Sequence, residues 1–492
     1  MLSILPTKLG GPFDADPGNH KTEQEVDAQP WAGELAHNHS MKARELANRI
    51  CDMLQRNNHQ ALLAGGCVRD LLLCREPADY DVATDATPVE VAGLFPESVA
   101  VGAQFGVILI PQDGLKVEVA TFRSDVGYSD GRHPDRVVYA QSPQEDVRRR
   151  DFTINGLLMR HDTGEVLDDV NGQEDLRAGI IRAIGDPEHR FAEDKLRMMR
   201  AVRFAARFAF EIEPGTFRAI RRQAEEIQQV SPERLREELT KMLTEGAARR
   251  TFELLDETGL LGQILPEIAA MKGVGQPPQF HPEGDVWIHT RLMLENLAKG
   301  VSPTLAWGVL LHDVGKPPTF QSAAETGDRI RFNHHVDVGV RMGEAMCRRL
   351  RFSNEDTEQI TSLIGNHMRF GAAEEMNKAT LKRFVRLREF DEHLELHRLD
   401  CLSSHRNLDS YRFVQKFLEE TPPQQVRPER LLTGDDLLEM GYHPGPLFAE
   451  ILRKLEDAQL EGQIQGKEEA RRYVLKSFRE KQVSLSKGGG KP

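Results

Sequence analysis

The sequence LAGGCVRDLLL at residues 63–73, followed by DYDVAT at residues 79–84, is the most informative part of the chain. A short apolar run ends in Gly65 and Gly66, and glycines at a strand end let backbone N–H groups approach an anion without a Cβ in the way. A helix that begins there adds the positive end of its dipole, and Arg69 lies one turn further on. The pattern predicts a strand–turn–helix unit that binds a polyphosphate.

Asp79 and Asp81 in this stretch are separated by one residue. Residues i and i+2 of a strand point to the same face, so the two carboxylates are expected to lie close together. Such a pair is costly unless a divalent cation neutralises it, and Mg²⁺ on paired carboxylates suits nucleotidyl transfer. Glu118, in VEV at residues 117–119, is a third carboxylate on a neighbouring strand. We therefore predict Asp79, Asp81 and Glu118 as catalytic residues, with Mg²⁺ held by the two aspartates.

The hydrophobic pattern divides the chain into a mixed part and a helical part. A helical pattern at 41–57 precedes strand-like runs at 61–64, 80–83, 107–110 and 117–122, which predicts a small α+β domain built on a mixed sheet. From about residue 190 the strand signals disappear, apolar residues recur three and four apart, and prolines mark helix borders. The remainder is therefore expected to be all-α.

Composition excludes several classes of protein. The 492 residues include 64 Lys and Arg against 77 Asp and Glu, a formal net charge of −13. General coating of nucleic acid needs an excess of cations, so only a local basic groove fits this balance. Residues 195–222 supply one, with eight Lys and Arg against two Glu. The chain lacks a long apolar run, a signal-peptide pattern and a C-x-x-C pair, which predicts a protein of the reducing cytoplasm that does not span a membrane.

Two further motifs complete a family pattern. RRDFTIN lies at residues 149–155, and FAEDKLRMMRAVRF lies at residues 191–204. With the glycine turn and the D-x-D pair, they resemble the class II tRNA nucleotidyltransferase and bacterial poly(A) polymerase family, within the DNA polymerase β-like nucleotidyltransferases. The resemblance covers most of residues 44–410. The family commonly has Gly where Cys74 stands and Ala where Gly156 stands, and neither position is expected to take part in the chemistry.

The resemblance implies roles for the residues of these motifs. Arg150 would contact the triphosphate, and Asp151 and Asn155 would meet the ribose. Asp194 and Arg197, three residues apart and so expected on one helix face, would read the incoming base. A carboxylate accepts from the amino group that cytosine and adenine share, while Arg donates to a ring nitrogen or to O2. The predicted nucleotide-binding residues are Gly65, Gly66, Arg69, Arg150, Asp151, Asn155, Asp194, Arg197, Arg200 and Arg203.

A second set of residues indicates a metal site in the helical part. LLHDVGK at residues 310–316 places an adjacent His-Asp pair after an apolar helix, with further histidines on both sides. The set resembles HD-domain phosphohydrolases, in which a bound metal acidifies water for attack on a phosphoester. The resemblance implies 2′,3′-cyclic phosphodiesterase, 2′-nucleotidase or phosphatase activity, with Lys316 holding a phosphate. The predicted ligands of a Mn, Ni, Fe or Zn ion are His289, His312, Asp313 and Asp400, with His335 and His367 as candidates for a second metal.

The resemblance implies a fold and a domain order. The fold class is α+β, with a polymerase-β-like nucleotidyltransferase head on a mixed sheet, an all-α neck and body, and an α-helical HD domain. The predicted divisions are a disordered leader (1–40), the head (41–170), a helical neck that binds RNA and the base (171–275), the HD domain (285–410), a C-terminal helical segment (420–482) and a disordered tail (483–492).

The function that we predict is template-independent addition or repair of the 3′-terminal CCA of tRNA. The enzyme, of EC 2.7.7 type, would use CTP and ATP and release pyrophosphate. Two alternatives share the head motifs: a bacterial poly(A) polymerase, and a partial enzyme that adds only CC or only A. Two others come from different classes: a metal-dependent phosphohydrolase whose head merely binds RNA, and a noncatalytic RNA-binding protein. The intact D-x-D pair argues against the last, since binding alone needs no paired carboxylates.

Overall fold

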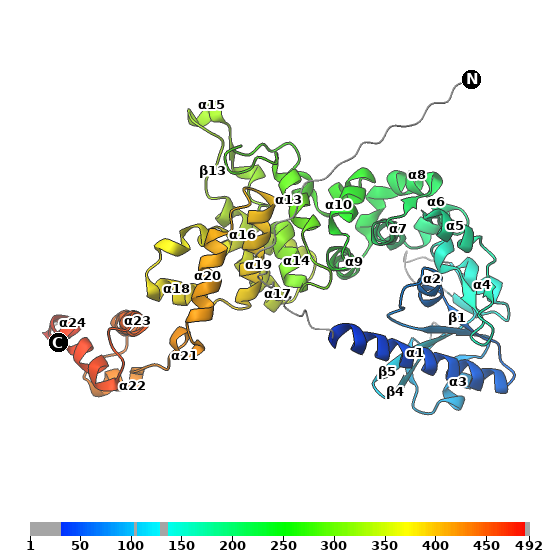
Figure 1. The fold of residues 1–492 in the computed structure, drawn as a ribbon, viewed down its shortest axis with the longest axis horizontal. Coiled ribbons are helices and arrows are strands. Elements are labelled where there is room, and N and C mark those ends of the chain that lie inside the picture. Colours follow the sequence, from blue (N-terminus) through cyan, green and yellow to red (C-terminus); the bar gives the residue numbers. More distant parts are fainter. Residues whose placement is uncertain (1–30, 103–105, 128–135, 488–492) are drawn as a thin grey trace, which may run out of the picture.

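The chain is arranged along one long axis, with the head at one end and the last helices at the other (Figure 1). The structure is a computed structural model that describes residues 31–102, 106–127 and 136–487. Residues 128–135 lie outside the described residues, as do residues 1–30 of the expected leader and residues 488–492 of the expected tail. No helix in the described ranges combines the length and the hydrophobicity that a membrane crossing requires.

A seven-stranded mixed sheet forms the base of the head, in the order β3-β4-β5-β2-β1-β8-β9. Strand β1 pairs antiparallel with β2 and β8, whereas β2 and β5 run parallel with Asp81 opposite Glu118. The four strand-like runs of the sequence all lie in this sheet, which confirms the expected fold class. The strands are β1 (Ala61–Ala64), β2 (Asp81–Thr84), β3 (Val99–Gly102), β4 (Val107–Gln112), β5 (Leu115–Thr121), β8 (Leu158–Met159) and β9 (Val166–Leu167). A separate hairpin is formed by β6 (Arg123–Val126) and β7 (Arg136–Tyr139).

Helix α1 (Trp31–Arg56) packs against the head sheet through an apolar stripe. Leu46, Ile50 and Leu54 recur four residues apart and are buried, as expected for one face of an amphipathic helix. The helix begins at Trp31, so residues 31–40 are helical and do not belong to a disordered leader. No proline interrupts residues 31–40, so the helix extends back without a break. The other head helices are α2 (Gly66–Leu72), α3 (Pro88–Leu94), α4 (Pro143–Arg148) and the 3₁₀ helix η2 (Thr153–Asn155).

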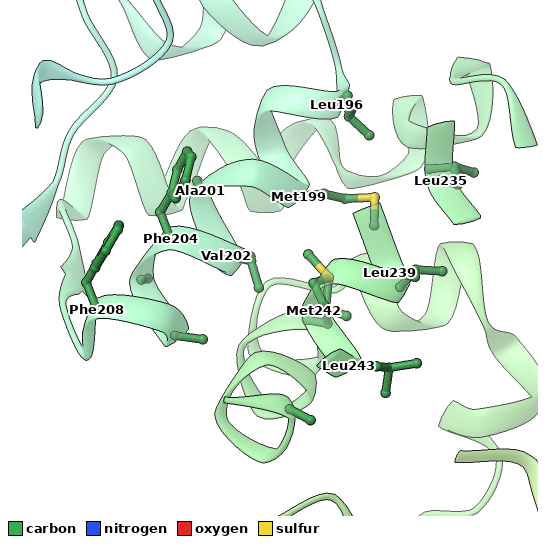
Figure 2. Close-up of a cluster of buried hydrophobic side chains, with 14 of the residues drawn as sticks. Leu196, Met199, Ala201, Val202, Phe204, Phe208, Leu235, Leu239, Met242 and Leu243 are labelled. Carbon is green, nitrogen blue, oxygen red and sulfur yellow. The ribbon is translucent and has the colours of Figure 1, made fainter. Parts of the chain in front are cut away.

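The neck is a helical layer centred on α7 (Leu196–Phe208) and α9 (Pro232–Thr244). Figure 2 shows that Met199 and Val202 of α7 face Leu239 and Met242 of α9 in one buried cluster. A short parallel pair, β10 (Ile180–Ile181) with β11 (Glu211–Ile212), lies within this helical part. The remaining elements are α5 (Gly172–Ala178), α6 (Pro187–Glu193), α8 (Pro214–Gln223), η3 (Ala224–Gln229), α10 (Ala248–Glu257), α11 (Leu260–Ile264) and α12 (Pro266–Ala269).

The following helices form the HD region, which shares its core with the neck. One hydrophobic core runs without interruption from Ala43 in the head to Leu399 in α19. At the neck, the indole Nε1 of buried Trp307 donates to Thr240 Oγ1 at 3.0 Å. The helices are α13 (Val286–Glu295), α14 (Pro303–Leu311), α16 (His335–Arg349), α17 (Asn354–Asn366), η5 (His367–Glu375), α18 (Lys378–Phe384), α19 (Phe390–Ser403) and α20 (Asp409–Glu420).

An excursion between α14 and α16 projects from the HD region at the top of Figure 1. It contains a short antiparallel strand pair in which Phe320 lies opposite Phe332. We call residues 317–334 the HD excursion. Its elements are η4 (Pro317–Thr319), β12 (Phe320–Gln321), α15 (Ala323–Thr326) and β13 (Arg331–Phe332).

The last three helices form a C-terminal helical unit with a core of its own, separate from that of the neck and HD region. Polar contacts join the unit to α18 and to the turn after it: Arg383 of α18 pairs with Asp457, and Arg386, just beyond the helix, donates from Nη1 to Glu456 Oε1 at 2.6 Å. Helix α24 continues to Lys487, so residues 483–487 of the expected tail are helical. The elements are α21 (Pro423–Val426), which leads into the unit, α22 (Gly434–Glu439), α23 (Pro446–Leu460) and α24 (Lys467–Lys487).

The two departures from the family pattern have physical consequences. Cys74 has a left-handed backbone, with φ of 53°. Arg75 N–H donates to Asp70 O and Cys74 N–H to Leu71 O, which is the type of helix end that favours glycine. Gly156, in contrast, has no space for a side chain, because an added Cβ would lie 2.8 Å from Val170 Cγ2.

We therefore expect Cys74→Gly to raise the free energy of unfolding by about 0.5–1 kcal/mol. The left-handed backbone costs an L-residue roughly 1–2 kcal/mol, and the greater freedom of glycine in the unfolded chain offsets part of that gain. Gly156→Ala is the matched control and should destabilise the chain, since Val170 must move. Urea unfolding followed by circular dichroism measures both, and a destabilised Cys74→Gly variant would contradict the expectation.

Candidate functional site

A cavity of about 480 Å³ opens where α2, β2, the segment at 149–155 and α7 meet. We call it the head cavity. All ten residues that the sequence predicts to bind the nucleotide line it, together with Asp81. Its lining residues are Gly65, Gly66, Arg69, Asp81, Arg149, Arg150, Asp151, Asn155, Asp194, Arg197, Arg200, Arg203, Phe204 and Arg207.

The glycine turn forms one wall of the head cavity. Gly65 has φ of +71°, and a Cβ at this position would lie 2.7 Å from Arg150 Nη1. The turn therefore needs glycine both for its backbone conformation and for the close approach of the arginine. The Gly65 N–H donates to Leu157 O at 3.0 Å, which ties the turn to the 3₁₀ segment beside it.

Arg69 is buried and rigidly held. Its Nε donates to Asp70 Oδ1 at 2.8 Å, and its Nη1 donates to Asn155 Oδ1 at 2.6 Å. The guanidinium also lies over the ring of Phe208 of α7, 4.6 Å from its centre. These contacts join α2, the 149–155 segment and α7 at one cation.

Asp151 holds Arg200, another arginine that lines the head cavity. Arg200 Nε and Nη2 donate to Asp151 Oδ2 at 2.8 and 2.7 Å, while Asp151 Oδ1 accepts from Phe152 N–H and from Asn155 Nδ2. Burial alone would raise the pKa of Asp151, but Arg200 and these hydrogen bonds lower it to about 2. Asp151 is therefore ionised at neutral pH and fixes the orientation of Arg200.

Asp194 and Arg197 line the cavity but do not share a helix face. Helix α6 ends at Glu193, Asp194 is extended with φ of −144°, and α7 begins at Leu196. Asp194 Oδ2 accepts from Arg234 Nη2 at 2.8 Å, whereas Arg197 Nη1 donates to Glu193 Oε2 at 2.6 Å. The expectation of one helical face is wrong because the chain changes direction at Asp194, and separate partners position the two side chains.

The partners Glu193 and Arg234 were not singled out by the sequence. Glu193 Oε2 accepts from both Arg190 Nη1 and Arg197 Nη1 at 2.6 Å. Arg203, one of the predicted nucleotide-binding residues, lines the cavity and donates to Glu238 Oε1 at 2.6 Å. Such pairings join α7 to α6 and α9, and only the fold reveals them.

The three carboxylates predicted as catalytic lie at and beside the start of β2. Asp81 begins β2 opposite Glu118 on β5, and Asp79 is exposed just before β2. Burial, followed by the nearby charges of Glu118 and Asp79, raises the pKa of Asp81 to about 6, against the opposing effect of Arg150. Of the three residues, only Asp81 lines the head cavity. Asp79 lines a neighbouring hollow.

The second set of predicted residues gathers around Asp313, at the end of α14. His312 Nε2 lies 3.1 Å from Asp313 Oδ2, and the Nε2 atoms of His335 and His367 lie 3.9 and 3.8 Å from Oδ1. His289 Nε2, from α13, lies 3.2 Å from Asp400 Oδ1. We call these residues, His289, His312, Asp313, His335, His367 and Asp400, the HD cluster.

Second-layer contacts orient the imidazoles of the HD cluster. The Nδ1 atoms of His312, His335 and His367 lie 2.7–2.9 Å from the carbonyl oxygens of Val309, Phe332 and Ile364, respectively. A carbonyl only accepts, so Nδ1 carries the proton and Nε2 keeps its lone pair toward Asp313. Within the described chain, these three buried Nε2 atoms and Asp313 Oδ1 have no hydrogen-bond partner.

His289 is oriented differently from the other three histidines. Its Nδ1 lies 2.7 Å from Glu283 Oε1, a carboxylate that the sequence analysis did not predict. Burial alone would lower the pKa of His289, but Asp400 and Glu283 raise it to about 9. Burial lowers the pKa of His367 to about 4, which leaves that imidazole neutral.

Comparison with known proteins identifies the chain. A poly(A) polymerase head domain matches residues 61–182, a probable RNA- and SrmB-binding site of polymerase A matches residues 209–272, and an HD domain matches residues 285–398. The CCA-adding enzyme of Levilactobacillus brevis is 32% identical over 427 residues, which cover 85% of this chain and 94% of that protein. The chain belongs to the CCA-adding enzyme family.

Other members of the family agree over nearly the whole length. The CCA-adding enzyme of Bacillus cytotoxicus is 30% identical over 432 residues, which cover 87% of this chain and 97% of that protein. A crystal structure of the Bacillus stearothermophilus CCA-adding enzyme in complex with CTP has a TM-score of 0.64 at 25% identity, covering 89% of this chain and 98% of that one. A nucleotidyltransferase head is therefore present in this chain, together with an HD domain.

Both sites of this family member offer donors that suit a divalent metal. In the head, burial and then repulsion by Glu118 and Asp79 raise the pKa of Asp81, and a divalent cation relieves such repulsion. In the HD cluster, the buried Nε2 atoms of His312, His335 and His367 converge on Asp313, and in the described part of the chain none of these three nitrogens has a hydrogen-bond partner. Two tight groups share Asp313: one with His289 and His312, the other with His335 and His367.

We expect Gly315→Ala to weaken metal binding by the HD cluster roughly 10- to 100-fold, the size of effect seen when ligand orientation is lost. An added Cβ would lie 2.0 Å from His335 O and 2.6 Å from Gly339 N, so α16 would have to move and take His335 with it. Equilibrium dialysis with Mn²⁺ measures the change. Gly371→Ala in η5, where a Cβ meets nothing within 4 Å, is the matched control. Equal Mn²⁺ affinity in both variants would contradict the expectation.

Proposed function

We propose that this chain adds the 3′-terminal CCA to tRNA from CTP and ATP. The observation that carries the proposal is the head cavity itself, where a glycine turn, arginines held by carboxylates and Asp81 meet in one space. The family supports it: solved CCA-adding enzymes include one from B. stearothermophilus in complex with CTP and one from Thermotoga maritima complexed with tRNA. We place the enzyme in the cytoplasm, in keeping with its five unpaired cysteines.

In this proposal the 3′-hydroxyl of tRNA attacks the α-phosphate of the nucleotide, and pyrophosphate leaves. Asp79 and Asp81 would hold Mg²⁺, with Glu118 as the third carboxylate. Bound Mg²⁺ supplies activation of the attacking oxygen and stabilisation of the leaving pyrophosphate. The carboxylates themselves position the reacting end of the nucleotide at the start of β2.

The triphosphate would lie against the glycine turn and its neighbouring cations. Arg150 is close to Gly65, and Asp146 keeps it oriented through bonds to its Nε and Nη2 at 3.2 and 3.0 Å. Arg69 approaches from the other side of the turn. Because both guanidiniums are held before any ligand arrives, phosphate binding needs little reorganisation.

The base would be read by Asp194 and Arg197. Their separate partners, Arg234 and Glu193, hold them at fixed positions in the wall. Exposed Arg218 and Arg221 of α8 extend the basic surface along which an RNA backbone can lie. The ribose contacts of Asp151 and Asn155 and the phosphate contacts of Arg200 and Arg203 belong to the same proposal.

Three RNA substrates distinguish CCA addition from the alternatives. The purified chain is offered tRNA lacking CCA, tRNA ending in CC and an unstructured RNA, with CTP and ATP separately and together, and the products are sequenced. CCA addition restricted to tRNA is expected. Long A tails on unstructured RNA would instead identify a poly(A) polymerase, and incorporation of C alone or A alone would identify a partial enzyme.

Replacement of Asp81 by Asn should reduce nucleotide incorporation on the order of 10³-fold, because metal stabilisation of phosphoryl transfer contributes several kcal/mol. The measurement is single-turnover incorporation of labelled CTP into tRNA lacking CCA. Asp162→Asn, in an exposed turn of the same domain, is the control and should retain wild-type rates. Retention of the wild-type rate by Asp81→Asn would refute the assigned role.

We also propose that the HD cluster hydrolyses phosphoesters when it holds a transition metal. The specific observation is the set of partnerless Nε2 atoms around Asp313, with Lys316 Nζ 2.7 Å from Asp313 Oδ2. A bound Mn, Ni, Fe or Zn ion supplies an acidified water. The ligands would be His289, His312, Asp313 and Asp400, with His335 and His367 for a second ion.

Paired variants separate the two activities. His312→Ala should abolish Mn²⁺-dependent hydrolysis of adenosine 2′,3′-cyclic phosphate and retain CCA addition, because the HD cluster is remote from the head cavity. Asp81→Asn should show the reverse. A phosphodiesterase assay and the incorporation assay are run on both proteins. If both variants lost both activities, the assignment of two independent sites would be wrong.

A further inference from the structure

A second cavity of about 480 Å³ opens directly above the HD cluster. We call it the HD cavity. His335 and Asp400 of the cluster line it, together with Lys316. Its other lining residues come from four segments: residues 277–281 before α13, the HD excursion, Met368 of η5, and residues 404–405 after α19. A ligand whose phosphate reaches the cluster must therefore place the rest of its structure between these walls.

One wall of the HD cavity presents a flat apolar surface. Phe280 is 50% exposed, and the guanidinium of Arg329 lies 5.7 Å from the centre of its ring. Arg329 comes from the HD excursion, whereas Phe280 precedes α13, so the contact joins two separate segments of the cavity lining. Neither belongs to the HD cluster, and the proposed hydrolysis gives neither of them a role.

The lining of the HD cavity also includes a second ring, Phe332, and the cation Lys316. Lys316 Nζ lies 5.5 Å from the centre of the Phe332 ring and 2.7 Å from Asp313 Oδ2. The lining of the cavity thus combines a cation at the HD cluster, Lys316, with an exposed aromatic ring beside a second cation, Phe280 with Arg329. A phosphate joined through a short polar spacer to a flat ring matches this arrangement, and a nucleoside phosphate has that chemistry.

We propose that Phe280 and Arg329 determine the substrate of the HD cavity by stacking on the nucleobase of a nucleoside 3′-phosphate, such as the last nucleotide of an RNA. The inference rests on the proposed hydrolytic function of the HD cluster and adds the part of the substrate that is recognised. A nucleobase is favoured over the ring of a phosphotyrosine because the same chain carries a nucleotidyltransferase head and an RNA-binding match. Arg329 also supplies donors for ring nitrogens and carbonyl oxygens, which a phenyl ring lacks.

The test compares a substrate that has a base with one that has none. The full chain is incubated with Mn²⁺ and either adenosine 3′-monophosphate or glycerol 2-phosphate, and the KM and kcat of hydrolysis are measured for each substrate. Phe280→Ala should raise KM for adenosine 3′-monophosphate about tenfold, a typical loss for one stacked base, with kcat nearly unchanged. Its kinetics with glycerol 2-phosphate should stay at wild-type values, and Phe280→Trp should restore the low KM.

Matched variants and substrates exclude a merely structural effect. Phe320→Leu removes an exposed ring of the same excursion that does not line the cavity, and it should leave both substrates unaffected. Arg329→Ala should act like Phe280→Ala. An equal loss on both substrates, or no loss on adenosine 3′-monophosphate, would overturn the proposal. Faster hydrolysis of a phosphotyrosine peptide than of adenosine 3′-monophosphate would overturn it in favour of a peptide ligand.

A binding measurement keeps this inference distinct from the hydrolytic function. If the wild-type chain with Mn²⁺ hydrolyses neither substrate, the proposed hydrolysis is wrong. Calorimetric titration of adenosine 3′-monophosphate, with saturating CTP in the head cavity, then tests the stacking alone. About tenfold weaker binding to Phe280→Ala would support the base site, and equal or absent binding to both proteins would refute it.

Discussion

The two faces of α7 set the geometry on which the head cavity depends. One face, with Met199 and Val202, is buried against α9 (Figure 2), whereas Arg197 and Arg200 of the same helix line the head cavity. Burial of the apolar face fixes the position of α7, and therefore how far its arginines extend into the head cavity, since close-packed interiors are hard to deform. The hydrophobic core that continues from the head into the HD region therefore determines the distance between the glycine turn and the residues expected to read the base.

The head cavity and the HD cluster arrange their charged side chains in opposite ways. The chain has a formal net charge of −13, yet its head cavity is lined by arginines, most of them held by a carboxylate such as Asp146, Asp151 or Glu193. The acidic residues near the cavity thus orient cations and do not cancel them. The HD cluster reverses the arrangement, with a buried carboxylate, Asp313, surrounded by imidazoles whose protons are directed away from it.

Sequence spacing and motifs predicted the features that depend on residues close together in the chain or on a recognisable motif. The strand at 61–64, the placement of Glu118 on a strand beside Asp81, and the convergence of the HD residues all follow from spacing and motif, and the structure has them. Asp194 shows the limit: three-residue spacing predicts a shared helix face, but the helix begins two residues later. Contacts such as Arg234 with Asp194 and Glu283 with His289 depend on how distant elements pack, and no spacing rule contains that information.

The C-terminal helical unit has an apolar interior of its own, which is not continuous with the core shared by the head, neck and HD region. Its contacts with α18 and with Arg386, just beyond that helix, include ion pairs and hydrogen bonds. Natural selection can therefore lengthen, exchange or erode this module with little effect on either cavity. Sequence divergence between members of the family should accumulate there faster than in the neck, where a change in packing would reach both the head and the HD region.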